Sequence, residues 1–202
     1  EDLAQILRRR ARMDAPSVVD MVRQVARGVA AAAEAGIVHR DLKPQNLFLT
    51  DGEPAIWKIL DFGVSKLASD DAALTRGEAI GTPRYMAPEQ ARGESVDTRA
   101  DVHALGAIAY RALTGRPPFS AEDGAPVILE VLSKMPARPG AIVKVPGDVD
   151  LALAVALAKK REDRYEGAVA FAEALEAALV GKLASSTKDK ARSLLEALPW
   201  GS

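Results

Sequence analysis

Cysteine is absent from this chain of 202 residues, which excludes disulfide bonds and thiolate metal sites. Histidine occurs twice, as His39 and His103, and two such distant residues do not suggest a zinc site. No apolar run approaches the roughly 18 residues of a membrane span. The first residues, Glu1-Asp2-Leu3, do not resemble a signal peptide. We therefore expect a cytoplasmic protein with no membrane span.

Charge of one sign is also lacking. The chain has 27 basic and 28 acidic residues, which nearly cancel. Such a balance implies no bulk attraction to nucleic acid or to anionic lipid, and we expect no nucleic-acid partner. A chain of this length can bury one good core.

The N-terminal segment, residues 2–12, places its apolar side chains on one helical face and its arginines mostly off it. Two interpretations of the arginines Arg8, Arg9, Arg10 and Arg12 stay open. They form either a solvated basic helix end or a site for an acidic substrate or partner.

Several longer helices are predicted from apolar spacing. One begins near Pro16 and ends at Gly36, and residues 98–114 are apolar around almost the whole circumference, which predicts a buried central helix. Further helices are expected at 120–133, 148–160 and 168–180. Residues 184–202 are rich in Ser, Thr and Lys, which predicts a flexible tail. Its few apolar residues could dock on the domain, contact a partner, or have lost their continuation.

A polar loop at residues 39–46 lies between two short apolar runs, 37–38 and 47–49, both expected as strands. The turn Asp51-Gly52 predicts that the second run pairs with residues 56–60 as a hairpin. The loop contains Asp41, Lys43 and Asn46. A carboxylate, a cation and an amide oxygen suit phosphoryl transfer, with proton acceptance, charge neutralisation and Mg²⁺ binding as their respective tasks.

Three ordered motifs carry a family resemblance: His39-Arg40-Asp41-Leu42-Lys43-Pro44-Gln45-Asn46, Asp61-Phe62-Gly63 and Ala87-Pro88-Glu89. Together they resemble the eukaryotic-type serine/threonine protein kinases, and we expect a bacterial member. The resemblance implies a mainly α fold, the large C-terminal kinase lobe. This lobe would be a helical bundle around a buried central helix, with short β-hairpins carrying the catalytic loop. It would cover residues 1–183, with an activation segment at 61–89.

By the same resemblance, Asp41 is the catalytic base and Lys43 contacts the phosphate of ATP. Asn46 and Asp61 would hold Mg²⁺ (or Mn²⁺), and the partner would be a protein substrate. Phe48 would pack against the adenine ring, although packing in the core explains it equally well.

Regulatory and supporting residues are implied too. Arg40 would bind the phosphate of a phosphorylated Thr75, unless Thr75 is an ordinary exposed threonine. Thr82 would bridge Asp41 and Lys43, unless it only occupies a turn.

The supporting contacts are expected around the catalytic loop. Asp101 would accept the backbone N–H groups of the turn at His39 and Arg40. Arg164 would pair with Glu89, unless the two are unrelated surface charges.

The 202 residues contain no G-x-G, and the first lysine is Lys43. The Gly-rich loop, strand lysine and helix glutamate of a kinase small lobe (N-lobe) are therefore not among them. We expect an N-lobe supplied in cis and a nearly inactive isolated chain. The alternatives are a non-catalytic binding or scaffold module, and a site completed by a separate chain.

Overall fold

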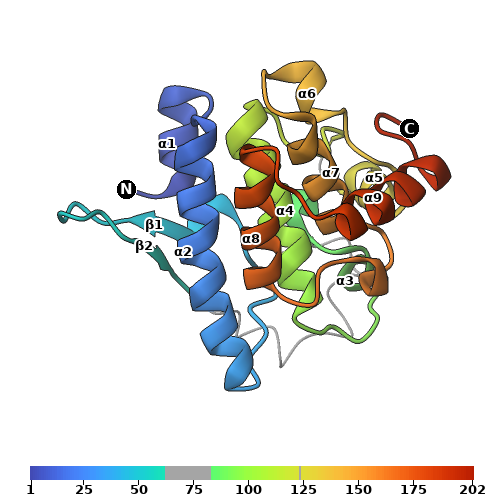
Figure 1. Cartoon of the computed structure of the whole chain (residues 1–202). Coiled ribbons are helices and arrows are strands. Elements are labelled where there is room, and N and C mark those ends of the chain that lie inside the picture. Colours follow the sequence, from blue (N-terminus) through green and yellow to red (C-terminus); the bar gives the residue numbers. More distant parts are fainter. Residues whose placement is uncertain (62–82, 123) are drawn as a thin grey trace.

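The computed structural model describes residues 1–61, 83–122 and 124–202, and the mainly α prediction is confirmed (Figure 1). The α-helices are α1 (Leu3–Arg10), α2 (Ala15–Glu34), α3 (Pro88–Ala91), α4 (Arg99–Thr114), α5 (Ala125–Ser133), α6 (Pro139–Ile142), α7 (Gly147–Ala156), α8 (Ala168–Leu179) and α9 (Ser185–Ala197). Short 3-10 turns are η1 (Pro44–Asn46), η4 (Pro83–Tyr85) and η5 (Arg161–Asp163), and the strands are β1 (Leu47–Leu49) and β2 (Trp57–Ile59).

The first two helices have clear start signals. The Asp2 carboxylate accepts a hydrogen bond from Gln5 N (2.8 Å) at the start of α1, and the Gln5 side chain accepts one from Asp2 N. Asp14 accepts from Ser17 N (2.9 Å) and caps α2. These caps satisfy N–H groups that have no partner within the helix. Helix α2 then buries one apolar stripe: Val18, Met21, Val22, Val25, Ala26 and Val29.

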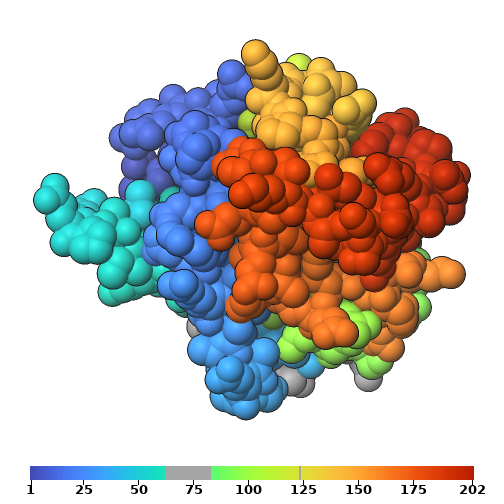
Figure 2. Space-filling model, viewed as in Figure 1, coloured from blue at the N-terminus to red at the C-terminus, as the bar shows by residue number. Residues whose placement is uncertain are grey.

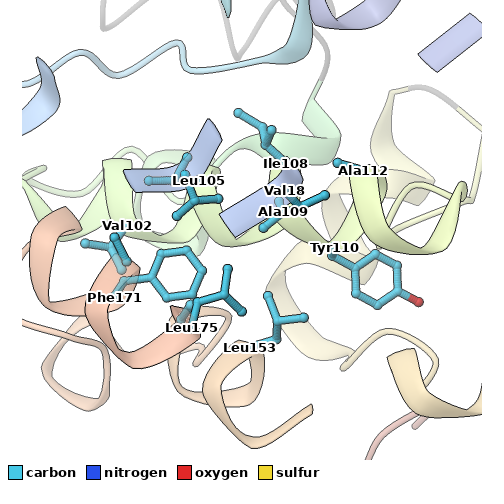
Figure 3. Packing of buried hydrophobic residues seen from close by; sticks show 14 of the residues in the cluster. Val18, Val102, Leu105, Ile108, Ala109, Tyr110, Ala112, Leu153, Phe171 and Leu175 are labelled. Carbon is cyan, nitrogen blue, oxygen red and sulfur yellow. The ribbon is translucent and has the colours of Figure 1, made fainter. Parts of the chain in front are cut away.

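Helix α4 is the centre of the molecule. Nearly all of its residues are buried, and it packs against α2, α7 and α8 (Figure 3). Gly106 permits a close approach to α7, because a Cβ at this position would lie 2.9 Å from Ala156 Cβ. The helix ends at Gly115, whose φ of 77° is left-handed and favours glycine. In the part of the chain that the structure describes, no helix has both the length and the hydropathy for crossing a bilayer.

The predicted hairpin is present, with β1 antiparallel to β2 and Phe48 opposite Lys58. The strand expected at residues 37–38 is absent. The reason lies in the hydrogen bonds: Ile37 N donates to Ala32 O at the end of α2, and His39 N donates to the Asp101 carboxylate. The backbone is satisfied without a neighbouring strand.

The helix expected from residue 120 begins instead at Ala125. Ser120 N and Ala121 N both donate to the Glu130 carboxylate at 3.0 Å, so this segment forms a loop that folds back on α5. Asp123, the other half of the expected cap, lies outside the described residues.

The flexible tail expected at 184–202 is wrong, because these residues form α9 and pack against α7. Figure 2 shows its red surface continuous with the orange surface of α8. Lys188 forms an ion pair with Asp148 at 2.9 Å, and Gly201 N donates to Pro136 O. The polar composition misled because it describes only the outer face. The inner face is buried or partly buried and repeats at helical spacing: Ala191, Leu194, Leu195 and Leu198.

Candidate active site

The backbone of the loop at 39–46 is held from below by helix α4. The Asp101 carboxylate, 1% exposed, accepts from His39 N at 2.9 Å and from Arg40 N at 3.0 Å. Burial raises the pKa of Asp101, although both N–H donors act in the opposite direction. Arg40 has a φ of 64°, an uncommon value for a residue with a Cβ. Asp101 therefore stabilises a turn that the backbone alone disfavours.

The His39 ring joins this loop to the end of β2. Its Nδ1 accepts from Asp41 N at 3.3 Å, so Nε2 is the atom that donates to Leu60 O, also at 3.3 Å. The buried ring is thus a structural link between the segment before Asp61 and the segment that carries Asp41.

Three polar side chains of the loop come together. Lys43 Nζ lies 2.8 Å from Asp41 Oδ2, and both side chains are 23% exposed, so solvent can reach them. Asn46 is 7% exposed and donates through Nδ2 to Asp41 O at 2.9 Å. This contact fixes the amide nitrogen, and the amide oxygen has no hydrogen-bond partner among the described residues. The arrangement presents a carboxylate, an ammonium group and a neutral oxygen together.

Asp61 lies at the end of the hairpin and is exposed. Leu60 N donates to Asn46 O at 2.8 Å, which brings the backbone before Asp61 to the loop. Asp61 has a φ of 51°, in the left-handed region that aspartate tolerates better than most residues. Phe62 and Gly63, the rest of the motif, lie outside the described residues.

Phe48 is half-buried on β1 and forms an isolated bridge with Asp2. Its neighbour Leu47 is fully buried in the main core, whereas Leu49 is partly buried. Thr75 and Thr82, with the regulatory and bridging roles expected of them, lie outside the described residues.

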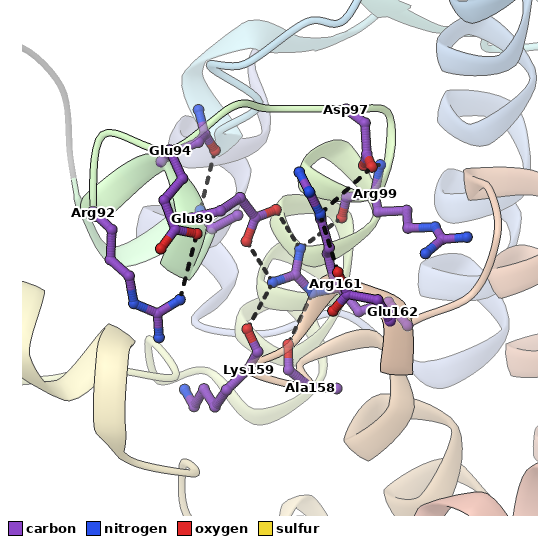
Figure 4. A network of polar contacts seen from close by, with 12 residues as sticks. Glu89, Arg92, Glu94, Asp97, Arg99, Ala158, Lys159, Arg161 and Glu162 are labelled. Carbon is purple, nitrogen blue, oxygen red and sulfur yellow. Dashed lines mark hydrogen bonds and ion pairs between the residues drawn. The ribbon is translucent and has the colours of Figure 1, made fainter. Parts of the chain in front are cut away.

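Glu89 and Arg164 form a buried ion pair, at 2.6 Å and 2.7 Å between the two guanidinium nitrogens and the two carboxylate oxygens. Arg164 is 2% exposed, and its remaining donors bind backbone oxygens of Arg99, Ala158 and Lys159. Figure 4 shows the network around Glu89. The pair joins α3 to the segment after α7, residues 75 positions apart in sequence.

Gln90 was missed by the sequence analysis. Its Oε1 accepts from Ala87 N at 3.1 Å, and its Nε2 donates to Arg40 O at 2.8 Å. One amide therefore links the Ala87-Pro88-Glu89 motif to the loop that carries Asp41. A glutamine at the third position of a helix that begins with proline is a known signal for the first of these bonds, but not for the second.

The segment before Ala87 is anchored by aromatic and cationic residues. Arg84 Nη1 donates to Phe119 O at 2.7 Å. Lys159 Nζ lies 4.5 Å from the centroid of the Phe119 ring and donates to Val131 O. Burial, with the nearby charges of Arg164 and Arg92, lowers the pKa of Lys159 to about 7.

Comparison with known proteins adds a family to this geometry. The sequence model of the protein kinase domain matches residues 1–178. Serine/threonine-protein kinase Pkn1 of Myxococcus xanthus is 43% identical over 192 residues, which cover 92% of this chain and 28% of Pkn1. The chain thus spans less than a third of the length of this relative.

Solved structures agree on the fold. The PknI kinase domain of Mycobacterium tuberculosis superposes with a TM-score of 0.67 and 28% identity, covering 87% of this chain and 60% of that domain. A structure of Rad53 in complex with AMP-PNP has a TM-score of 0.69 at 23% identity, covering 85% of this chain and 42% of that one, and shows the likeness of fold alone. The chain belongs to the protein kinase domain family, among the eukaryotic-type serine/threonine kinases found in bacteria.

Proposed function

We propose that this chain supplies the catalytic loop and metal ligands of a serine/threonine protein kinase that moves the γ-phosphate of ATP to a protein hydroxyl. The contact between Lys43 Nζ and Asp41 Oδ2, with Asn46 bound to the same loop, carries the proposal. Asp41 accepts the proton of the attacking serine or threonine hydroxyl. The hydroxyl oxygen bonds to the γ-phosphorus as the bond to the β-phosphate oxygen breaks, and ADP leaves. Lys43 offsets the negative charge of the transferred group.

The donor set fits magnesium or manganese. Within the described residues, no cluster of three His, Cys, Asp or Glu side chains could hold a metal by itself. Mg²⁺ does not need one, because it binds through one or two carboxylates, water and substrate phosphates. Asn46 has an amide oxygen without a hydrogen bond, and Asp61 has an exposed carboxylate on the adjoining segment. When bound, the ion would neutralise phosphate charge.

Activity would also require an N-lobe, supplied in cis. The 202 residues have no G-x-G and no lysine before Lys43, so two charge-assisted phosphate contacts and half of the adenine site are not among them. Each such contact contributes about 1.5 to 3 kcal/mol, and losing both with half of the adenine site costs about 4 kcal/mol. That loss weakens a micromolar ATP affinity to about millimolar.

The test compares the 202-residue chain with a fusion that carries the small lobe of a relative ahead of Glu1. Both are assayed with Mg-ATP and a mixture of peptides containing serine and threonine. We expect transfer by the fusion and almost none by the chain alone. Asp41→Asn should lower the rate of the fusion by about 10²- to 10⁴-fold, the usual contribution of a general base. Asp51→Asn, in an exposed turn, is the matched control and should have no effect.

Two results would contradict the proposal. Turnover of about 1 to 100 per second by the chain alone would show that no small lobe is required. A folded fusion that binds Mg-ATP and transfers no phosphate would indicate a scaffold module.

A further inference from the structure

Four arginines gather where the ends of α1 and α4 meet, the uppermost part of Figure 1, and we call them the arginine strip: Arg10, Arg12, Arg111 and Arg116. Contacts fix the two ends together. Met13 N donates to Ala112 O at 2.8 Å, and Arg111 Nη1 donates to Ala11 O at 3.2 Å. A Cβ placed on Gly115 would lie 3.6 Å from Arg12 Cβ. Residues about a hundred positions apart in sequence therefore form one cationic surface.

The positive charge of the strip is not neutralised. Within residues 1–61, 83–122 and 124–202, no carboxylate forms an ion pair with any of its four members. The neighbouring Arg9 differs, because it pairs with Glu1 at 2.7 Å. Asp14 is close to Arg10, but its carboxylate already accepts from Ser17 N and Ser17 Oγ. Like charges left together on a surface favour an anionic ligand.

The strip extends toward the segment that precedes Ala87. Turn η4 packs against α4, and its last residue, Tyr85, is close enough for the charge of Arg111 to act on its hydroxyl. In a kinase, this segment lies beside the bound substrate. We infer that the arginine strip binds an acidic stretch of the protein substrate, to one side of the hydroxyl that accepts phosphate. The inference rests on the proposed kinase function and names a substrate class for it.

Other anionic partners fit less well. Binding of single-stranded nucleic acid depends on exposed aromatic rings for base stacking. The tyrosines beside the strip, Tyr85 and Tyr110, are 8% and 1% exposed and cannot stack on a base. Insertion into a membrane needs an exposed apolar anchor, and the described large apolar residues that are exposed lie elsewhere. Guanidinium groups match carboxylates as paired donors.

The test measures peptide binding to the 202-residue chain by fluorescence anisotropy at low salt. One peptide has a serine followed by a run of glutamates, and its partner has glutamines instead. The strip variant combines Arg10→Glu, Arg12→Glu and Arg116→Glu. The control variant makes the same charge change at exposed positions outside the strip, with Arg27→Glu, Lys160→Glu and Lys182→Glu.

We expect the glutamate peptide to bind about 10-fold more tightly than the glutamine peptide, and the strip variant to lose that preference. The control variant should keep it, and so should Asp41→Asn, since binding needs no phosphate transfer. An Asp41→Asn chain that keeps the preference while the fusion fails to phosphorylate would reject the kinase proposal alone. Equal binding of both peptides, equal loss in both charge variants, or tighter binding of a single-stranded oligonucleotide of the same charge would overturn the inference. Circular dichroism establishes that each variant is folded.

Discussion

Arg164 shows how much one side chain can hold together. It binds both oxygens of Glu89 and the backbone oxygens of three other residues, and it is almost completely buried. Removing one partner of such a pair leaves the other charged and desolvated. The cost is therefore larger than the net value of the pair.

We predict that Arg164→Ala lowers the free energy of unfolding by about 3 to 5 kcal/mol, measured by urea denaturation. Arg192→Ala is the matched control, because Arg192 and its partner Asp189 are 62% and 72% exposed, and it should cost less than about 1 kcal/mol. Similar losses in both variants would show that burial of the Glu89 pair does not matter.

At this scale, the motif residues were predictable as residues and not as contacts. The sequence named Asp41, Lys43, Asn46 and Asp101, because phosphoryl transfer requires particular functional groups. It did not predict the link from Gln90 to Arg40 O, since that bond joins positions 50 apart and depends on how α3 packs. The catalytic and metal-binding roles themselves remain predictions.

At the scale of elements, α9 differs most from expectation. The prediction weighed overall composition, whereas the helix depends on the spacing of a few apolar residues. Ala191 is fully buried under α9, while Ser193 faces solvent.

We predict that Ala191→Asp lowers the melting temperature and costs about 2 kcal/mol or more, because it buries a carboxylate without a partner. Ser193→Asp adds the same charge on the exposed face and should change stability by less than about 0.5 kcal/mol. Thermal unfolding followed by circular dichroism measures both. If the two substitutions have equally small effects, α9 is not docked in solution.

Element boundaries failed where tertiary hydrogen bonds replaced local ones. Residues 37–38 have the composition of a strand, but α2 and Asp101 bind their neighbouring N–H groups. The loop at Ser120 and Ala121 follows from Glu130, a residue about ten positions away. Helices with a continuous apolar stripe, such as α2 and α4, were predicted well because local periodicity and burial agree.

At the scale of the whole molecule, weak nucleotide binding follows from the proposed need for an N-lobe. A ligand stabilises a folded protein by an amount set by its concentration relative to the dissociation constant. With a millimolar constant, Mg-ATP at about 10 mM should stabilise the 202-residue chain by about 1.4 kcal/mol. The measurement is urea denaturation with and without Mg-ATP.

ATP with EDTA in place of magnesium is the control and should stabilise less, because Asn46 and Asp61 would have no ion to bind. Micromolar affinity would instead give about 4 kcal/mol at the same concentration, and that result would show that this chain binds ATP fully without a small lobe.

The sequence by itself determined the family, the central helix and the identity of the polar groups at residues 39–46, because chemistry fixes residue types and short motifs keep them in order. Only the tertiary structure decided which backbone groups hold that loop, that α9 packs against α7, and that Arg12 and Arg111 share a surface. The physical reason is distance along the chain. Periodicity and spacing report on neighbours within a few residues, whereas these contacts form when segments tens of residues apart bury a common core.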